Sequence, residues 1–112
     1  MANKEKGEFT LLAGDEQWTL RLTTNGCCEL EEKTGKTIGD IVAGINRSSM
    51  VALRWFLWAC LQDKHGAVFT EKNVRKVGEV IDAAGGLHGT LMQINKFIRE
   101  NMNPDAVDGK GG

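Results

Sequence analysis

The stretch MVALRWFLWACLQDKH, residues 50–65, decides the fold because it predicts a helix with almost no polar face. Ser48 or Ser49 can cap its start and Gly66 can end it. A helix that is apolar on all sides lies at the centre of a core or faces a partner with part of its surface. Two tryptophans and a phenylalanine each bury on the order of 150–250 Å². A chain of 112 residues cannot turn all of that surface inward, so both alternatives stay open.

A β-hairpin is predicted before this helix. The segments GEFTLLA (7–13) and QWTLRLT (17–23) flank Gly14-Asp15, a pair that suits a type II′ turn. With the turn between Ala13 and Glu16, one face of the hairpin is apolar and the other is polar. The predicted register pairs Leu11 with Trp18, Phe9 with Leu20, Thr10 with Thr19, and Glu8 with Arg21. A two-stranded hairpin is marginal alone, so its apolar face must pack on the helices.

Four further helices are predicted from apolar residues that recur with helical spacing. The first begins at Thr23 or Thr24, ends at Thr34 and buries Cys27 and Leu30. The stripes of the other three are Ile38, Ile41, Val42 and Ile45; Val74, Val77, Ile81 and Ala84; and Leu87, Leu91, Ile94, Ile98 and Met102. We therefore expect an α+β fold, mostly helical, in which an N-terminal β-hairpin packs on a bundle of about five short helices.

The same pattern predicts one α+β domain over residues 7–102. Residues 1–6 are expected to be a flexible N-terminus. Residues 103–112, NPDAVDGKGG, hold the only proline and few apolar side chains, so they are expected to be a disordered tail.

Composition excludes several classes of partner. The net charge is −1 and no run exceeds three like charges, which argues against nucleic acid, since phosphate binding needs a basic face. The longest apolar run contains Arg54 and is shorter than the roughly 20 residues that a membrane span needs. The charged start of the chain lacks the apolar segment of a secretory signal. Three cysteines without a Cys-x-x-Cys spacing fit reduced thiols, so we expect a soluble, cytoplasmic protein.

Gly35-Lys36-Thr37 has the form of the end of a phosphate-binding P-loop. That motif needs a glycine where Leu30 stands, and it needs a preceding strand, whereas the residues before Gly35 are helical and acidic. Gly35 suits the end of one helix, where a left-handed conformation favours glycine. Thr37 suits the cap of the next helix. The tripeptide therefore predicts a corner between two helices.

No catalytic or cofactor site is predicted. Cys60 and His65 are five residues apart on one helix and do not share a face, so they do not form a nucleophile–base pair. The two histidines, His65 and His88, and the adjacent cysteines match no zinc-ligand spacing. We expect a protein without enzymatic activity, metal or cofactor.

Three segments carry a resemblance to a known family: WTLRLTTNGCCELEEKTGKTIGDI (18–41), SSMVALRWFLWACLQ (48–62) and TEKNVRKVGEVIDAAGG (70–86). In this order and spacing the chain resembles the tail assembly chaperone family of siphophages and gene transfer agents, over roughly residues 8 to 100. The resemblance rests on helix caps and apolar stripes and includes no catalytic signature.

The resemblance implies a chaperone that binds the long, helical tape measure protein and keeps it soluble while tail-tube subunits polymerise. Such a protein would be absent from the finished particle. The tail-tube protein and a second copy of the chain are further candidate partners. The alternative is a structural tail protein, a tube or completion component, although one hairpin is little strand for a tube subunit. The residues expected to contact the client are Trp55, Phe56, Trp58, Leu61, Met92 and Phe97.

Overall fold

The computed structural model describes residues 7–102, so the predictions for residues 1–6 and 103–112 lie outside the described residues. It confirms the α+β class, with one antiparallel hairpin and mostly helix in the rest of the described chain. The elements follow in the order β1 (Glu8–Ala13), β2 (Glu16–Arg21), α1 (Thr24–Thr34), α2 (Ile38–Asn46), α3 (Met50–His65), the short 3₁₀ helix η2 (Glu71–Asn73), α4 (Val74–Ala83) and α5 (Gly86–Met102).

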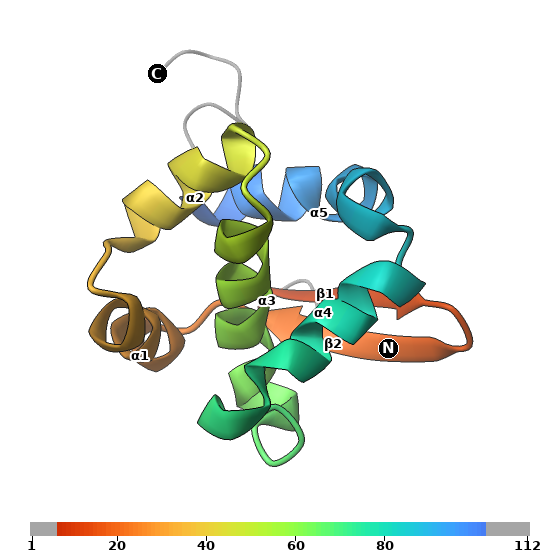
Figure 1. Cartoon of the computed structure of the whole chain (residues 1–112), viewed down its shortest axis with the longest axis horizontal. Helices are drawn as coiled ribbons and strands as arrows, with labels where there is room; N and C mark the ends of the chain where they lie inside the picture. Colours follow the sequence, from red (N-terminus) through yellow and green to blue (C-terminus); the bar gives the residue numbers. More distant parts are fainter. Residues whose placement is uncertain (1–6, 103–112) are drawn as a thin grey trace.

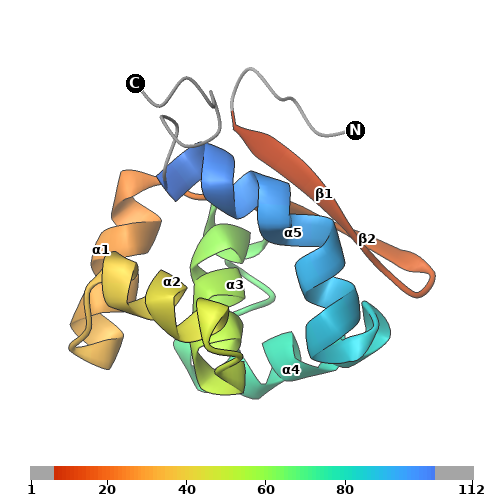
Figure 2. The same ribbon diagram turned by 90° about the horizontal axis from the view of Figure 1, so that it is seen from above.

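Helix α3 runs through the middle of the molecule. Figure 1 shows α1 and α2 on one side of it, α4 crossing in front, and the hairpin behind. Figure 2, the view from above, places α5 beside the hairpin on the side opposite α1 and α2. Helix α3 contacts β2, α1, α2 and α4, whereas α5 contacts α4 and β1. The apolar segment that decides the fold is thus the element around which the others pack.

The hairpin has the predicted register, with Leu11 opposite Trp18 and Phe9 opposite Leu20. Gly14 has φ +64°, and Ser48 is the only non-glycine residue with positive φ in the described chain. Asp15 therefore has negative φ, as a type II′ turn requires.

Side chains from the helices cover both edges of the hairpin. On β1, Leu12 donates its N–H to Gln93 Oε1 (2.9 Å) and accepts from Gln93 Nε2 (2.8 Å). On β2, Thr19 donates its N–H to His65 Nε2 (3.1 Å). Unpaired edge groups invite pairing with other chains, so these contacts fix the hairpin and blunt its edges.

The corner at Gly35-Lys36-Thr37 is confirmed. Gly35 has φ +71° and donates its N–H to the Glu31 carbonyl, which ends α1. Thr37 Oγ1 accepts the Asp40 N–H (3.0 Å) and so caps α2. The structure adds one contact that was not predicted, in which the Glu31 carboxylate accepts the Ile38 N–H (2.9 Å). Two side chains thus satisfy the start of α2.

The buried face of α1 differs from the prediction. Leu30 is buried as expected, but Cys27 is only half-buried and Gly26 is buried in its place. The reason is the close approach of α1 to α3, because a Cβ at Gly26 would lie 2.9 Å from the Ala59 carbonyl oxygen. Only glycine fits such a contact without a shift of one helix.

The two glycines inside helical stripes have different roles. A Cβ at Gly44 of α2 would lie 3.0 Å from the Cβ of Ala52 on α3. A Cβ at Gly78 of α4 would meet nothing closer than Arg54 Cδ, at 4.0 Å, which is an ordinary van der Waals distance. Close helix packing therefore accounts for Gly44 but not for Gly78.

Candidate functional site

Four of the six residues expected to contact a client are buried in the core. Phe56 and Leu61 are fully buried, Trp58 is 2% exposed and Phe97 is 4% exposed. The expectation that these side chains form a surface is therefore corrected.

Their burial has two physical causes. The hairpin and α1 cover the second half of α3, and the chain after α3 folds back so that Trp58 Nε1 donates to the Thr70 carbonyl (3.3 Å). Phe97 is off the main stripe of α5, but the hairpin packs against that side of the helix. The ring centroid of Phe97 lies 5.6 Å from that of Phe9 on β1. Helix α5 thus buries a wider face than its stripe predicts.

The other two predicted residues remain accessible but lie apart from each other in the fold. Trp55 is half-buried and packs edge-on against Trp58, with ring centroids 5.5 Å apart at 78°. Met92, on α5, is 70% exposed. Trp55 lines a groove on α3, described next, whereas Met92 lines neither of the two grooves there. Trp55 alone of the six stands at a hollowed surface beside exposed apolar side chains.

Sequence reasoning missed the most exposed apolar residues of α3. Met50 is 47% exposed and Val51 is 59% exposed, both in the first turn of the helix. We call this pair the α3 ridge. The signal was present in the sequence, since an all-apolar helix cannot be covered on every side in a small chain, but the aromatic residues drew the prediction to the second half of the helix.

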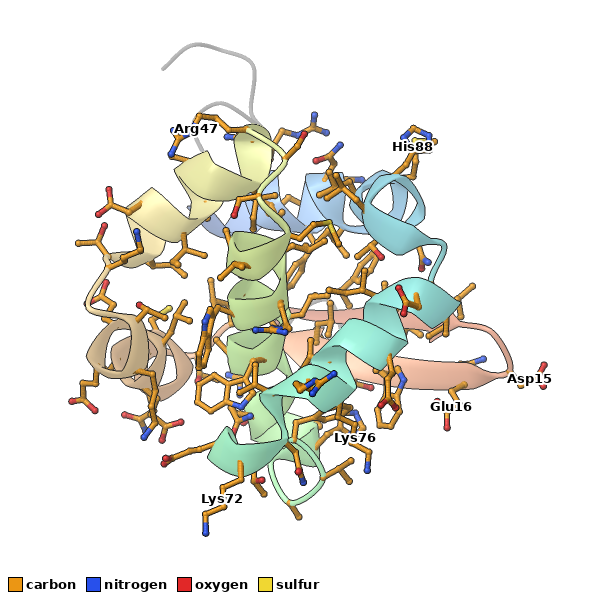
Figure 3. The ribbon with its side chains drawn as sticks, viewed as in Figure 1. Asp15, Glu16, Arg47, Lys72, Lys76 and His88 are labelled. Carbon is orange, nitrogen blue, oxygen red and sulfur yellow. The ribbon has the colours of Figure 1, made fainter. Side chains whose placement is uncertain are left out.

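A groove flanks the α3 ridge on each side, and Val51 lines both. The α2–α3 groove has a volume of ≈ 470 Å³, and Arg47 projects outward from the C-terminal end of α2 beside it (Figure 3). The α3–α4 groove has a volume of ≈ 410 Å³. The first is lined by Thr34, Lys36, Asp40, Ile41, Gly44, Arg47, Ser49, Val51, Ala52 and Trp55, and the second by Met50, Val51, Arg54, Arg75, Gly78, Glu79, Ile81 and Asp82.

The charges of these grooves are not paired with one another. The ion pairs recorded for the described chain are Arg21–Asp63, Lys33–Glu71, Lys64–Glu8 and Lys96–Glu100, and none of these residues lines either groove. Lys72 and Lys76 project from the opposite end of the molecule to the start of α3 (Figure 3). The charged groups beside the ridge are thus open to pairing with a partner.

Arg54 is the unusual polar residue of the site. Two buried side-chain nitrogens, Trp18 Nε1 and Arg54 Nε, have no acceptor among the residues that the structure describes. Trp18, on β2, packs against His65 and Phe69 and lines neither groove. Arg54 lines the α3–α4 groove, so its orphan donor lies at the candidate site.

The environment shifts the pKa of two thiols and of one histidine. Burial raises the pKa of Cys60 well above its ordinary value, and burial together with Glu31 raises the pKa of Cys27. Burial and the neighbouring Lys64 lower the pKa of His65, whose Nε2 already accepts the Thr19 N–H. Within residues 7–102 no group of three or more histidine, cysteine, aspartate or glutamate side chains is arranged to hold a metal ion.

Comparison with known protein families, curated proteins and solved structures finds no match to this chain. No helix in the described part of the chain is both long enough and apolar enough to cross a membrane.

Proposed function

We propose that this protein is a tail assembly chaperone that binds helical segments of a tape measure protein and keeps them soluble during tail tube assembly. The observation that carries the proposal is the α3 ridge, two large apolar side chains exposed between two grooves. Contiguous exposed apolar surface rimmed by polar residues is typical of protein interaction sites, and Met50 and Val51 are adjacent and flanked by the charged residues of both grooves. The order of sequence segments that resembles the chaperone family supplies the identity of the client.

The binding mode we propose is an amphipathic helix laid along α3. Its apolar stripe would cover Met50 and Val51, which stand between the two grooves, and the edge of the helix would reach the exposed part of Trp55. Anchors at i, i+3, i+4 and i+7 on the client fit such a surface. The contact is small, so one site binds moderately and many copies along one client supply avidity. Moderate affinity also lets polymerising tube subunits displace the chaperone.

Location and timing follow from this role. The chaperone would act in the cytoplasm of the bacterial host and would be absent from the finished particle. It would need no cofactor and would catalyse no reaction, because its work is to cover apolar surface on another chain. The tail-tube protein and a second copy of this chain are further partners that the same ridge could contact.

Co-expression tests the proposal. The proposal requires that a tape measure protein is encoded beside this gene, and fragments of that protein are expressed with and without the chaperone. We expect soluble fragment only with the chaperone. Val51→Gln removes an exposed apolar side chain and should weaken binding about tenfold, the order expected from one apolar contact. Leu12→Thr, which removes an exposed leucine of the hairpin, is the matched control.

The proposal fails if the fragment stays insoluble with the wild-type chaperone, or if Leu12→Thr impairs solubility as strongly as Val51→Gln does. Purified particles provide a second measurement. If mass spectrometry finds this chain in finished tails in stoichiometric amounts, the structural tail protein is the correct alternative and the chaperone proposal is wrong.

A further inference from the structure

The α3–α4 groove contains an arginine whose stem is held in place. Arg54 rises from α3 one turn after Val51, and its Cδ passes 4.0 Å from the position that a Cβ would take at Gly78 on α4. The stem therefore lies across the groove from one helix to the other. A long side chain held in this way loses less conformational entropy when its guanidinium binds a ligand.

The guanidinium of Arg54 has an unused donor. Its Nε is buried and has no acceptor among the described residues, and Arg54 takes part in none of the recorded ion pairs. A buried donor without an acceptor is costly, and a guanidinium presents a planar fork that matches a carboxylate. A partner that brings a carboxylate into the groove would pair with the guanidinium charge of Arg54, which no acid of the described chain neutralises.

Gly78 keeps the groove open above Arg54. A glycine in a helix interior lowers helix stability relative to alanine. The packing does not require it, because an added Cβ would have only an ordinary contact with Arg54. Its effect is to leave the α4 wall of the groove without a side chain beside the stem of Arg54. Access to Arg54 gives this glycine a role.

The charged residues on the α4 rim of the groove restrict the charge that a partner can carry. Glu79 and Asp82 line this rim together with Arg75, and neither acid is within ion-pair distance of an arginine in the described chain. These carboxylates would repel a polyanion such as nucleic acid or an anionic membrane. A partner with a single carboxylate and a basic flank fits both sides of the groove.

We infer that the α3–α4 groove binds an amphipathic protein helix that carries an aspartate or glutamate inside its apolar stripe, and that Arg54 pairs with this carboxylate. The helix also presents lysine or arginine toward Glu79 and Asp82. The inference rests on the proposed function only for the identity of the client, since the chemistry of the helix comes from the groove itself. It adds a sequence criterion for the client segments, because a purely apolar stripe would leave the charge of Arg54 without a partner.

The test uses synthetic amphipathic peptides of about 20 residues, long enough to form a helix. They share one leucine-rich stripe and a basic flank and differ at one central stripe position, which is Glu, Gln or Lys. Their affinities for the full-length protein are measured by fluorescence anisotropy. We expect the Glu peptide to bind about tenfold more tightly than the Gln peptide, as for a charge-assisted hydrogen bond, and the Lys peptide to bind most weakly.

Substitutions at two residues of the groove, Arg54 and Gly78, each have a matched control elsewhere in the protein. Arg54→Gln should abolish the preference for Glu, and Arg54→Lys, which keeps the charge but loses the fork, should reduce it. Arg99→Gln, at an exposed arginine of α5, should retain it. Gly78→Ala should weaken all three peptides without lowering thermal stability. Gly39→Ala, at an exposed glycine of α2 where a Cβ also has only ordinary contacts, should leave binding unchanged.

The inference is overturned if the Glu and Gln peptides bind equally, if the preference survives both Arg54 variants, or if no peptide binds. Its failure is distinct from failure of the proposed function. Equal binding of all peptides together with a solubilised tape measure fragment would reject the carboxylate and keep the chaperone. A clear preference for Glu with an insoluble fragment would keep the groove chemistry and reject the tape measure protein as the client.

Discussion

Two stretches of α3, residues 50–55 and the first six residues of its second part, 56–61, are both mostly apolar but have different environments. Residues 56–61 are all buried, covered by the hairpin, α1 and the chain that follows α3. Residues 50–55 include the exposed Met50 and Val51, the half-buried Trp55 and the orphan donor of Arg54. The difference comes from the lengths and positions of the neighbouring elements, because the hairpin reaches the second half of the helix and the first half lies between two grooves.

This comparison separates stability from binding along one helix. The second half should carry most of the free energy of folding, since its side chains lose their whole apolar surface to the core. The first half should carry the interaction with a partner, since apolar surface left exposed contributes little to folding and is available for binding. Substitutions in the two halves should therefore change different measured quantities.

The largest expected effect is that of Trp58→Ala. Trp58 is 2% exposed, and its Nε1 donates to the Thr70 carbonyl. Its truncation leaves a cavity and should lower the free energy of unfolding by about 3–5 kcal/mol. Trp55→Ala should cost less, about 1–2 kcal/mol, because its ring is only half-buried. Urea denaturation followed by circular dichroism measures both values.

The two tryptophans should also differ in binding. Trp55→Ala should weaken the interaction with the tape measure fragment while the protein stays folded. Equal losses of stability for the two variants would show that the two halves of α3 do not differ as the structure indicates, and Trp55 would then be a core residue.

The second pair of substitutions concerns the glycines that face α3. Gly26→Ala places a methyl group against the Ala59 carbonyl in the second half of the helix. We expect overpacking to lower the free energy of unfolding by about 1–3 kcal/mol. Gly78 lies opposite Arg54 in the first half of α3. Gly78→Ala should raise the free energy of unfolding by about 0.5–1 kcal/mol, because alanine has the higher helix propensity. Thermal melts of both variants against wild type give the signs. A stabilising Gly26→Ala would contradict the close approach of α1 and α3.

Much of the fold could be predicted from local patterns. The hairpin register followed from the pairing of Leu11 with Trp18 and Thr10 with Thr19. Helix-end chemistry predicted the cap at Thr37 and a cap at Ser48 or Ser49, and the structure shows Ser49 as that cap. These features depend on residues close together in the chain. The burial of Gly26 in place of Cys27 depends on how closely α1 approaches α3, and that distance has no local signal.

The site was harder to predict for the same reason. An all-apolar helix in a small chain predicts that some of its apolar side chains are exposed, but the elements that pack on the helix determine which ones. The sequence predicts large aromatic side chains as contact residues, yet size favours burial, and Phe56 and Trp58 lie in the core. Arg54 stood in the sequence as a charge within an apolar run. Its unsatisfied Nε and its position over Gly78 depend on the packing of α3 against α4.

The smallest expected effect is the pH dependence that His65 gives to the second half of α3. Burial and Lys64 lower the pKa of His65, so the folded protein binds fewer protons than the unfolded chain below the ordinary histidine value of about 6.5. Its contribution to stability is complete above that value and is lost as the pH falls through the lowered pKa. Protonation also removes the acceptor of the Thr19 N–H, which joins the hairpin to the helix.

His65→Gln should therefore flatten the fall in stability between about pH 7 and pH 5, the window in which an ordinary histidine titrates. His88→Gln, at an exposed histidine of α5 that projects away from the molecule (Figure 3), should keep the wild-type profile. Urea midpoints across this range measure the effect. Between pH 7 and pH 5, the affinity of peptides for the α3 ridge should change equally in wild type and in His65→Gln, because His65 lies at the other end of the helix. A drop in affinity that disappears in His65→Gln would show that the two halves are coupled, and the separation of stability from binding would be wrong.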